Sequence, residues 1–180
     1  MRRIIVSNVM SLDGFFERPN KVLDWVITDE EFFAYAKGLL RSVDTLLFGR
    51  ATYEHMAAHW PTAPSDEIAD LMNSLPKVVF SKSLQSVEWK HSRLVQGNIA
   101  EEVSRLKQQS GRDMVIFGSA TLASFLLQEN LIDEYRVILQ PVLLGEGTPL
   151  FKDIRETINL KLNSARKFGS GVVLLSYHKI

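Results

Sequence analysis

Short apolar runs rich in Val, Ile and Leu alternate with segments of helical periodicity through the first two thirds of this 180-residue chain. Apolar runs of this length between turn residues are typical of strands. Strands are predicted at 4–10, 45–48, 77–81, 93–95 and 114–117, and helices at about 28–43, 50–58, 65–75, 98–110 and 121–128. This alternation predicts an α/β fold with a mostly parallel central sheet and helices on both faces.

Cap residues indicate where three of the helices begin. Thr28 has Glu31 three residues further on, which is the spacing of a capping box. Asn98 and Glu101 have the same spacing, and Ser65 is the expected cap of the third helix.

The last third of the chain changes character, because strands follow one another there without a helix between them. Strands are predicted at Glu134–Gln140, at about 159–167 and at 172–178, and Gly169-Ser170-Gly171 is a hairpin turn signal. These strands are expected to add antiparallel pairs at one edge of the sheet. No linker composition interrupts the chain, so residues 1–180 are predicted to form one domain.

Composition excludes several classes of protein. Lys plus Arg and Asp plus Glu both number 21, so the net charge is zero, which argues against a nucleic-acid partner. There is no cysteine, and this excludes thiol catalysis and cysteine-based zinc sites. No apolar run approaches the length of a membrane span, and the short run after Arg3 does not fit a signal peptide. A cytoplasmic protein without a membrane partner is expected.

Ligands of α/β sheets bind beyond the carboxyl ends of the strands, so the loops at those ends are the candidate sites. The loops are Ser11–Gly14, Gly49–Glu54, Ser81–Ser83 and Gly118–Thr121. Gly permits close backbone approach and a helix N-terminus favours an anion, so these loops suit a phosphate group. Arg50 or Lys82 would add a charge-assisted contact. Short loops also use Gly and Ser simply as turn and cap residues, so the structural alternative stays open.

Standard nucleotide and metal signatures are missing. Residues 145–150 begin as Gly-Glu-Gly but lack the last glycine of a dinucleotide fingerprint, and no Walker A motif occurs. His55 and His59 could share a helix face, but Met56 stands where a zinc protease needs Glu. No metal site is therefore predicted.

Four carboxylates surround the first loop and are candidates for the acid that faces a substrate. Asp29 and Glu30 lie in the first turn of a helix, where carboxylates are favoured by the helix dipole alone. Asp24 lies beside a tryptophan, and Asp13 directly follows the first strand. Asp13 is the predicted catalytic residue, for substrate orientation or proton transfer.

Taken together, these loops resemble a known family. Four segments carry the resemblance: Ser11-Leu12-Asp13-Gly14, Leu47-Phe48-Gly49-Arg50-Ala51-Thr52-Tyr53-Glu54, Val78-Val79-Phe80-Ser81-Lys82 and Val115-Ile116-Phe117-Gly118-Ser119-Ala120-Thr121-Leu122. The chain resembles the dihydrofolate-reductase-like fold, and most closely the reductase domain of the bifunctional riboflavin-biosynthesis deaminase-reductase. The resemblance covers nearly the whole chain and implies a single-domain, three-layer α/β sandwich.

The resemblance implies an NADPH site. The residues that match its cofactor-binding positions are Gly49, Arg50 and Thr52 after the second strand, Ser81 and Lys82 after the third, and Gly118, Ser119, Ala120 and Thr121 before the last helix. Lys82 would favour NADPH over NADH through the adenosine 2′-phosphate. Ser119 stands where many members of the family have glycine.

The implied function is an NADPH-dependent reductase of a small heterocyclic, carbonyl or imine substrate, related to a pterin or a riboflavin precursor. A nucleotide-binding module of the same fold without turnover is the alternative. An enzyme that uses another phosphate-bearing ligand is a third hypothesis. Family habit implies a homodimer; the apolar strands at 137–139 and 172–175 could pair across a two-fold axis or be buried within one chain.

Overall fold

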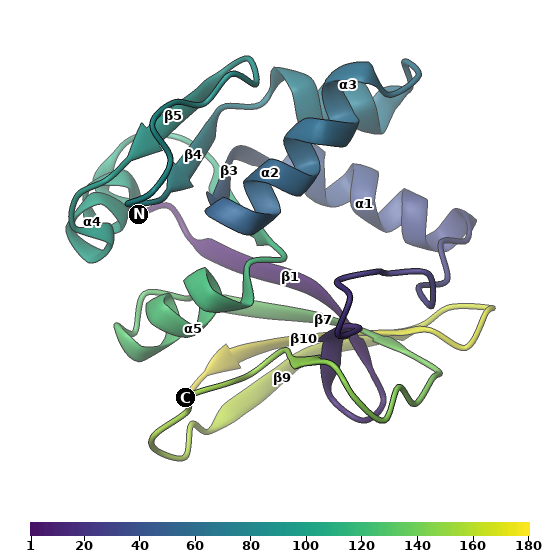
Figure 1. Ribbon diagram of the computed structural model, residues 1–180. Helices are drawn as coiled ribbons and strands as arrows, with labels where there is room; N and C mark the ends of the chain where they lie inside the picture. Colours follow the sequence, from purple (N-terminus) through teal and green to yellow (C-terminus); the bar gives the residue numbers. More distant parts are fainter.

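The structure, a computed structural model that describes residues 1–180, is built on one eight-stranded sheet (Figure 1). Its strands are β1 (Ile4–Ser11), β3 (Val43–Gly49), β4 (Lys77–Phe80), β5 (Ser92–Val95), β6 (Asp113–Phe117), β7 (Glu134–Gln140), β9 (Leu160–Lys167) and β10 (Val173–Lys179). The order across the sheet is β5-β4-β3-β6-β1-β7-β10-β9. Neighbouring strands from β5 to β7 are parallel, and β10 is antiparallel to both β7 and β9.

Helices cover both faces of this sheet and bury an apolar cluster on each. The helices are α1 (Glu30–Ser42), α2 (Arg50–His59), α3 (Glu67–Ser74), α4 (Ile99–Gln108) and α5 (Ala120–Gln128), with a 3-10 turn at Trp60–Thr62. On one face, Leu40, Tyr53 and Met72 bring α1, α2 and α3 against the sheet. On the other face, Val103 and Leu126 do the same for α4 and α5. The predicted three-layer α/β sandwich with a mostly parallel sheet is confirmed.

The helix starts differ from the prediction at two places. The predicted cap at Thr28 is wrong, because Asp29 caps α1 and accepts a hydrogen bond from the Phe32 N–H at 2.8 Å. Glu31 is not its box partner; its carboxylate accepts a hydrogen bond from the Gly169 N–H at 2.6 Å and ties α1 to the last hairpin. Thr28 and Asp29 are consecutive residues that can both cap a helix, and the start of α1 lies one residue later than predicted, so Asp29 is the cap.

The same shift occurs at the third helix. Asp66 rather than the predicted Ser65 caps α3, with its carboxylate 2.9 Å from the Ala69 nitrogen. Asn98 caps α4 as predicted, and its side chain accepts hydrogen bonds from the N–H groups of Ala100 and Glu101.

A second, two-stranded sheet was not anticipated from the sequence. It pairs β2 (Phe15–Glu17) with β8 (Thr148–Pro149). Gly147 makes this pairing possible: its φ is 154°, and a Cβ there would collide with the carbonyl oxygen of Glu17. The small sheet pairs Glu17 with Thr148.

The late strands pair within the chain. β7 lies between β1 and β10, and β10 lies between β7 and β9, so both are interior strands of the sheet. The two edge strands are β5 and β9, and all eight residues of β9 are exposed. None of the helices combines the length and the hydropathy needed to span a membrane.

Candidate functional site

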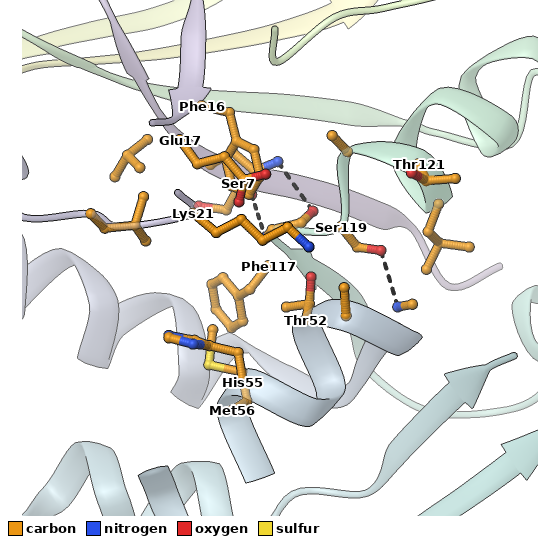
Figure 2. A pocket seen from close by; sticks show the side chains of 18 of the residues that line it. Ser7, Phe16, Glu17, Lys21, Thr52, His55, Met56, Phe117, Ser119 and Thr121 are labelled. Atoms are coloured by element: carbon orange, nitrogen blue, oxygen red, sulfur yellow. Dashed lines mark hydrogen bonds between the residues drawn. The ribbon is translucent and has the colours of Figure 1, made fainter. Parts of the chain in front are cut away.

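A cavity of about 880 Å³ opens at the carboxyl ends of the parallel strands, on the α1–α2–α3 face of the sheet. Side chains from β1, β2, α1, α2, α3 and the start of α5 line it (Figure 2). This volume suits a cofactor-sized or drug-sized ligand, since such sites commonly measure roughly 300–1,000 Å³. The position agrees with the general rule for ligand sites in α/β sheets.

The cavity collects most of the residues predicted to bind a cofactor. Eight of the nine line it: Gly49, Arg50, Thr52, Ser81, Gly118, Ser119, Ala120 and Thr121. Lys82 does not line the cavity, although its neighbour Ser81 does. The loops that follow β3, β4 and β6 therefore meet at one place.

The start of α2 is left open to this cavity. Gly49 is the N-cap residue, and no side chain caps the helix. The Gly49 N–H donates a hydrogen bond to the Ser119 hydroxyl at 3.1 Å, and a Cβ at Gly49 would collide with that hydroxyl. Arg50 and Thr52 then present the first turn of α2 to the cavity.

The start of α5 is also open. Gly118 and Ser119 have φ angles of 60° and 52°, and no side chain caps the helix. The Gly118 N–H donates to the Asn8 side chain at 2.6 Å, which fixes the turn against β1. A Cβ at Gly118 would lie 3.1 Å from Thr52 Cγ2, so the two open helix starts are closely packed. Ser119 thus adopts the left-handed conformation for which glycine is usual.

The structure does not bring Asp13 into the cavity. Its carboxylate accepts hydrogen bonds from the Ser11 hydroxyl at 2.6 Å and the Gly145 N–H at 2.7 Å, and also from the Leu144 N–H. The Ser11 bond, followed by the Gly145 bond, lowers the pKa of Asp13 to about 2. Asp13 is an exposed, ionised anchor for the 144–145 loop.

The other three candidate carboxylates also lie outside the cavity lining. Asp24 pairs with Arg18 at 2.9 Å, Asp29 caps α1, and Glu30 is exposed. The carboxylate that lines the cavity is Glu17 on β2. The sequence analysis missed Glu17. Its position depends on the pairing of β2 with β8, and strands of three and two residues are too short to show a periodic pattern in the sequence.

Glu17 belongs to a set of polar side chains around the cavity. Its Oε1 accepts a hydrogen bond from the Thr148 hydroxyl at 2.9 Å. The Tyr35 and Ser7 hydroxyls are 2.7 Å apart, and burial raises the pKa of Tyr35, so this phenol keeps its proton at neutral pH. His55, on α2, is a further titratable side chain in the lining.

Three cations line the cavity, and each lies beside an open helix start. Arg50 is the first residue of α2. Lys152 donates to the Thr121 hydroxyl at 3.3 Å, in the first turn of α5. Figure 2 shows the Lys21 side chain extending across the cavity, with its amino group directed toward Thr52 and Ser119. Positive charge and helix N-termini therefore coincide, which is the electrostatic pattern of an anion site.

The fold and this site define a three-layer α/β protein with a cavity where cationic side chains and two uncapped helix starts meet. The sequence matches the model of the RibD C-terminal domain family over residues 2–174, and the chain belongs to that family. It is 36% identical over 181 residues to the uncharacterized protein YyaP of Bacillus subtilis (strain 168), covering 98% of this chain and 95% of YyaP.

Solved structures share the fold. A protein from Shewanella sp. PV-4, whose name connects it with riboflavin biosynthesis, has a TM-score of 0.80 at 24% identity, covering 99% of both chains. The Thermotoga maritima deaminase and 5-amino-6-(5-phosphoribosylamino)uracil reductase has a TM-score of 0.73 at 12% identity, covering 99% of this chain and 57% of the other. Dihydrofolate reductase from Enterococcus faecalis, solved with NADP(H), has a TM-score of 0.66 at 16% identity, covering 98% and 96%. The resemblance to the dihydrofolate-reductase-like fold is confirmed.

Proposed function

We propose that this protein is an NADPH-dependent reductase of a small carbonyl or imine compound. The observation that carries the proposal is the convergence of two helix starts without side-chain caps, α2 and α5, on one cavity that also holds three cations. A dinucleotide has several phosphates, and each open helix start offers N–H donors to one of them. The solved relative that contains NADP(H) supports the same assignment.

The residues of the cavity fit such a cofactor. A side chain at Gly118 would press on Thr52, so glycine at this position lets the starts of α2 and α5 lie close together around a bound phosphate. Arg50 would contact the pyrophosphate together with Thr52, and Lys21 would add its charge from the opposite side. Lys82, at the rim beside Ser81, remains the proposed contact of the 2′-phosphate.

The chemistry divides between cofactor and protein. Bound NADPH supplies a hydride. The protein positions the substrate, excludes water and provides the proton that balances the hydride. We assign this proton transfer to Glu17, because its carboxylate lines the cavity and is oriented by Thr148. Tyr35 and Ser7 form a neutral hydroxyl pair that can hold a polar atom of the substrate.

Cofactor binding is tested by titrating NADPH while its fluorescence is followed. We expect saturable binding, and we expect Arg50→Ala to weaken it at least ~10-fold, because a hydrogen bond to a charged group contributes roughly 1.5–3 kcal/mol. Arg155→Ala, at an exposed position outside the cavity lining, is the matched control and should bind normally. Absence of binding at near-millimolar NADPH would contradict the proposal.

Turnover is tested with a panel of pterins, pyrimidines and aromatic carbonyl or imine compounds, followed by NADPH absorbance. For a compound that is reduced, Glu17→Gln should lower kcat by ~10²-fold or more, the usual contribution of a positioned general acid. Asp13→Asn is the contrasting variant and should keep turnover. Tight NADPH binding with no oxidation across the panel would favour the alternative, a nucleotide-binding module without turnover.

Two further expectations belong to this proposal. NADPH use implies a cytoplasmic protein. A homodimer would cover the exposed edge strand β9, because an unpaired edge readily adds a second strand. Light scattering coupled to gel filtration measures the mass, and a monomer would contradict this part of the proposal.

A further inference from the structure

Away from the helix starts, the cavity continues between α1, α2 and α3 and becomes apolar. Six side chains define this part, which we call the apolar lobe: Phe32, Phe33 and Ala36 of α1, Met56 of α2, Trp60 of the 3-10 turn and Met72 of α3. They come from three helices, so the lobe is built by the packing of the helical layer. Covering apolar surface of this kind with apolar ligand atoms removes both from water, which is favourable.

The polar atoms of the lobe side chains are already hydrogen-bonded to each other. The Trp60 indole N–H donates to the Met56 sulfur at 3.1 Å, so neither group requires a partner from a ligand. The Phe32 and Phe33 rings pack edge to face with centroids 5.9 Å apart. Phe33 is 43% exposed and forms the outer end of the lobe. The lobe therefore offers ring edges, a thioether and methyl groups.

The cations of the cavity lie elsewhere. Arg50 begins α2, Lys152 is bonded to Thr121, and Lys21 is directed toward Thr52. All three belong to the region that we assign to the cofactor phosphates. A phosphate group placed in the apolar lobe would lose its water without gaining a partner of opposite charge, which is strongly unfavourable.

We propose that the substrate is an uncharged, planar, conjugated carbonyl or imine compound without a phosphate group, held by its ring system in the apolar lobe. This inference rests on the proposed function and specifies its substrate class. In the reaction, bound NADPH would supply a hydride to the electrophilic carbon of C=O or C=N, and the π electron pair would move to oxygen or nitrogen. A proton from the Glu17 carboxyl completes the alcohol or amine, and NADPH becomes NADP⁺.

The test uses two probes that share one ring system, 2-naphthaldehyde and 2-naphthyl phosphate. Each is titrated calorimetrically into the protein saturated with NADP⁺. We expect the aldehyde to bind at least ~10-fold more tightly than the phosphate ester, since a dianion is disfavoured in an apolar lining. An equal or reversed preference would overturn the inference.

A charge placed in the lobe should reverse this preference. Phe33→Arg is suitable because Phe33 is 43% exposed and its replacement does not open the core. We expect weaker aldehyde binding, stronger phosphate-ester binding and an unchanged Kd for NADPH. Ile154→Arg, at a 45% exposed position outside the cavity lining, is the matched control and should change none of the three.

The NADPH titration separates this inference from the proposed function. If NADPH binds and the phosphate ester is preferred, the substrate class is wrong while the reductase proposal stands. If NADPH does not bind at all, the reductase proposal fails first. Phe33→Ala is a second variant, and it should weaken aldehyde binding without any gain for the phosphate ester.

Discussion

The five helices of this protein begin in two different ways. α1, α3 and α4 are each capped by an Asp or Asn side chain, from Asp29, Asp66 and Asn98. α2 and α5 begin at Gly49 and Ser119 without any side-chain cap. Unpaired N–H groups at a helix start cost stability unless water or a ligand satisfies them. The first turns of both uncapped helices line the cavity, so their free N–H groups are available to a ligand bound there.

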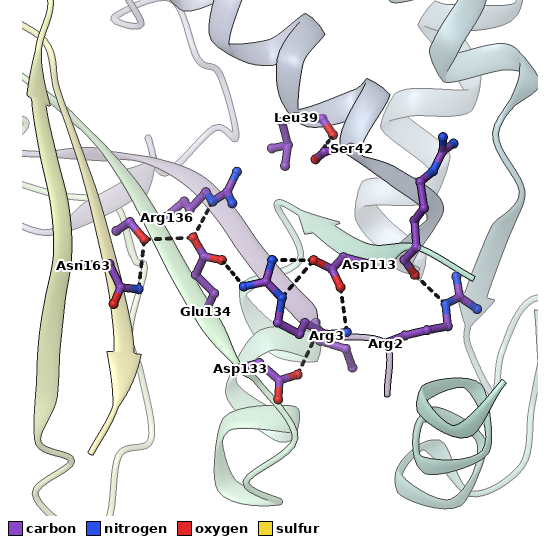
Figure 3. Close-up of polar contacts among 12 residues, drawn as sticks. Arg2, Arg3, Leu39, Ser42, Asp113, Asp133, Glu134, Arg136 and Asn163 are labelled. Carbon is purple, nitrogen blue, oxygen red and sulfur yellow. Dashed lines mark hydrogen bonds and ion pairs between the residues drawn. The ribbon is translucent and has the colours of Figure 1, made fainter. Parts of the chain in front are cut away.

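The two ends of the parallel strands show the same contrast for charges. At the amino ends, Arg3 pairs with Asp113 at 2.6 Å and with Glu134 at 3.3 Å, and Arg136 pairs with Glu134 at 2.7 Å (Figure 3). At the carboxyl ends, Arg50 makes no ion pair with any residue of the chain. The charges at the amino ends of the strands are paired and stabilise the fold. At the carboxyl ends, the charge of Arg50 remains available to a ligand.

The largest expected effect is the loss of a paired charge. Burial alone would raise the pKa of Glu134, but hydrogen bonds from Arg136 and Ser176 and the charge of Arg3 hold this pKa below its usual value. Glu134→Ala leaves the half-buried Arg136 without its partner, so we expect a loss of about 3–5 kcal/mol in the free energy of unfolding. Urea denaturation measures it.

A matched control for Glu134 is the exposed pair of Arg18 and Asp24. Asp24→Ala should cost less than about 1 kcal/mol, because exposed ion pairs contribute little. If both variants lose the same small amount, the amino-end network does not stabilise the fold as argued. NADPH binding by folded Glu134→Ala protein should be normal.

The second effect concerns the open start of α5. Gly118→Ala forces a side chain into a conformation with φ 60° and to within 3.1 Å of Thr52 Cγ2. We expect NADPH affinity to fall ~10-fold or more and stability to fall by about 1–3 kcal/mol, the usual cost of a strained backbone. Fluorescence titration and urea denaturation give the two values.

Gly38→Ala is the control for this substitution. Gly38 lies within α1, and a Cβ there meets no atom within 4 Å. Replacing it should stabilise the protein by about 0.5–1 kcal/mol, because Ala favours a helix interior over Gly. Equal NADPH affinity in both Ala variants would show that the conformation of Gly118 does not matter for binding.

A smaller effect is expected at a capped helix. Asp66→Ala removes the hydrogen bond to the Ala69 N–H, and we expect a loss of about 1 kcal/mol, the typical value of an N-cap. Thermal unfolding measures it, and NADPH affinity should stay unchanged. Asp66→Asn keeps the acceptor oxygen and is expected to restore most of the loss. A drop in NADPH affinity with Asp66→Ala would weaken the contrast between capped and open helices.

Much of this architecture could be predicted from the sequence, because strand and helix periodicities are local. The loops that follow β3, β4 and β6 are also local, so eight of the nine cofactor positions could be placed at one sheet edge and are found in one cavity. Glu17 could not be found, since its place depends on the pairing of β2 with β8, residues 131 positions apart at the Glu17–Thr148 contact. The apolar lobe likewise depends on how three helices pack together.

Asp13 and Glu17 lie four residues apart, and only tertiary contacts separate their roles. Both are carboxylates near the first loop, and the sequence prediction chose Asp13 because it lies just past the first strand, without considering Glu17. In the structure, Asp13 is bonded to backbone N–H groups of residues 144 and 145, whereas Glu17 faces the cavity. A pH titration distinguishes an anchor from a catalytic acid.

The smallest effect is the loosening of the 144–145 loop in acid. Hydrogen bonds from Ser11 and Gly145 lower the pKa of Asp13 to about 2, below its value of about 3.9 in an unfolded chain. The carboxylate therefore stabilises the loop fully above about pH 4, and the stabilisation is lost as the pH falls toward 2. The amide NMR signals of Leu144 and Gly145 should shift with a midpoint near pH 2. In Asp13→Asn they should no longer follow this transition, whereas Asp153→Asn should leave it unchanged. A midpoint near the ordinary carboxyl value would mean that Asp13 does not anchor this loop, and its assignment as the substrate-facing acid would return.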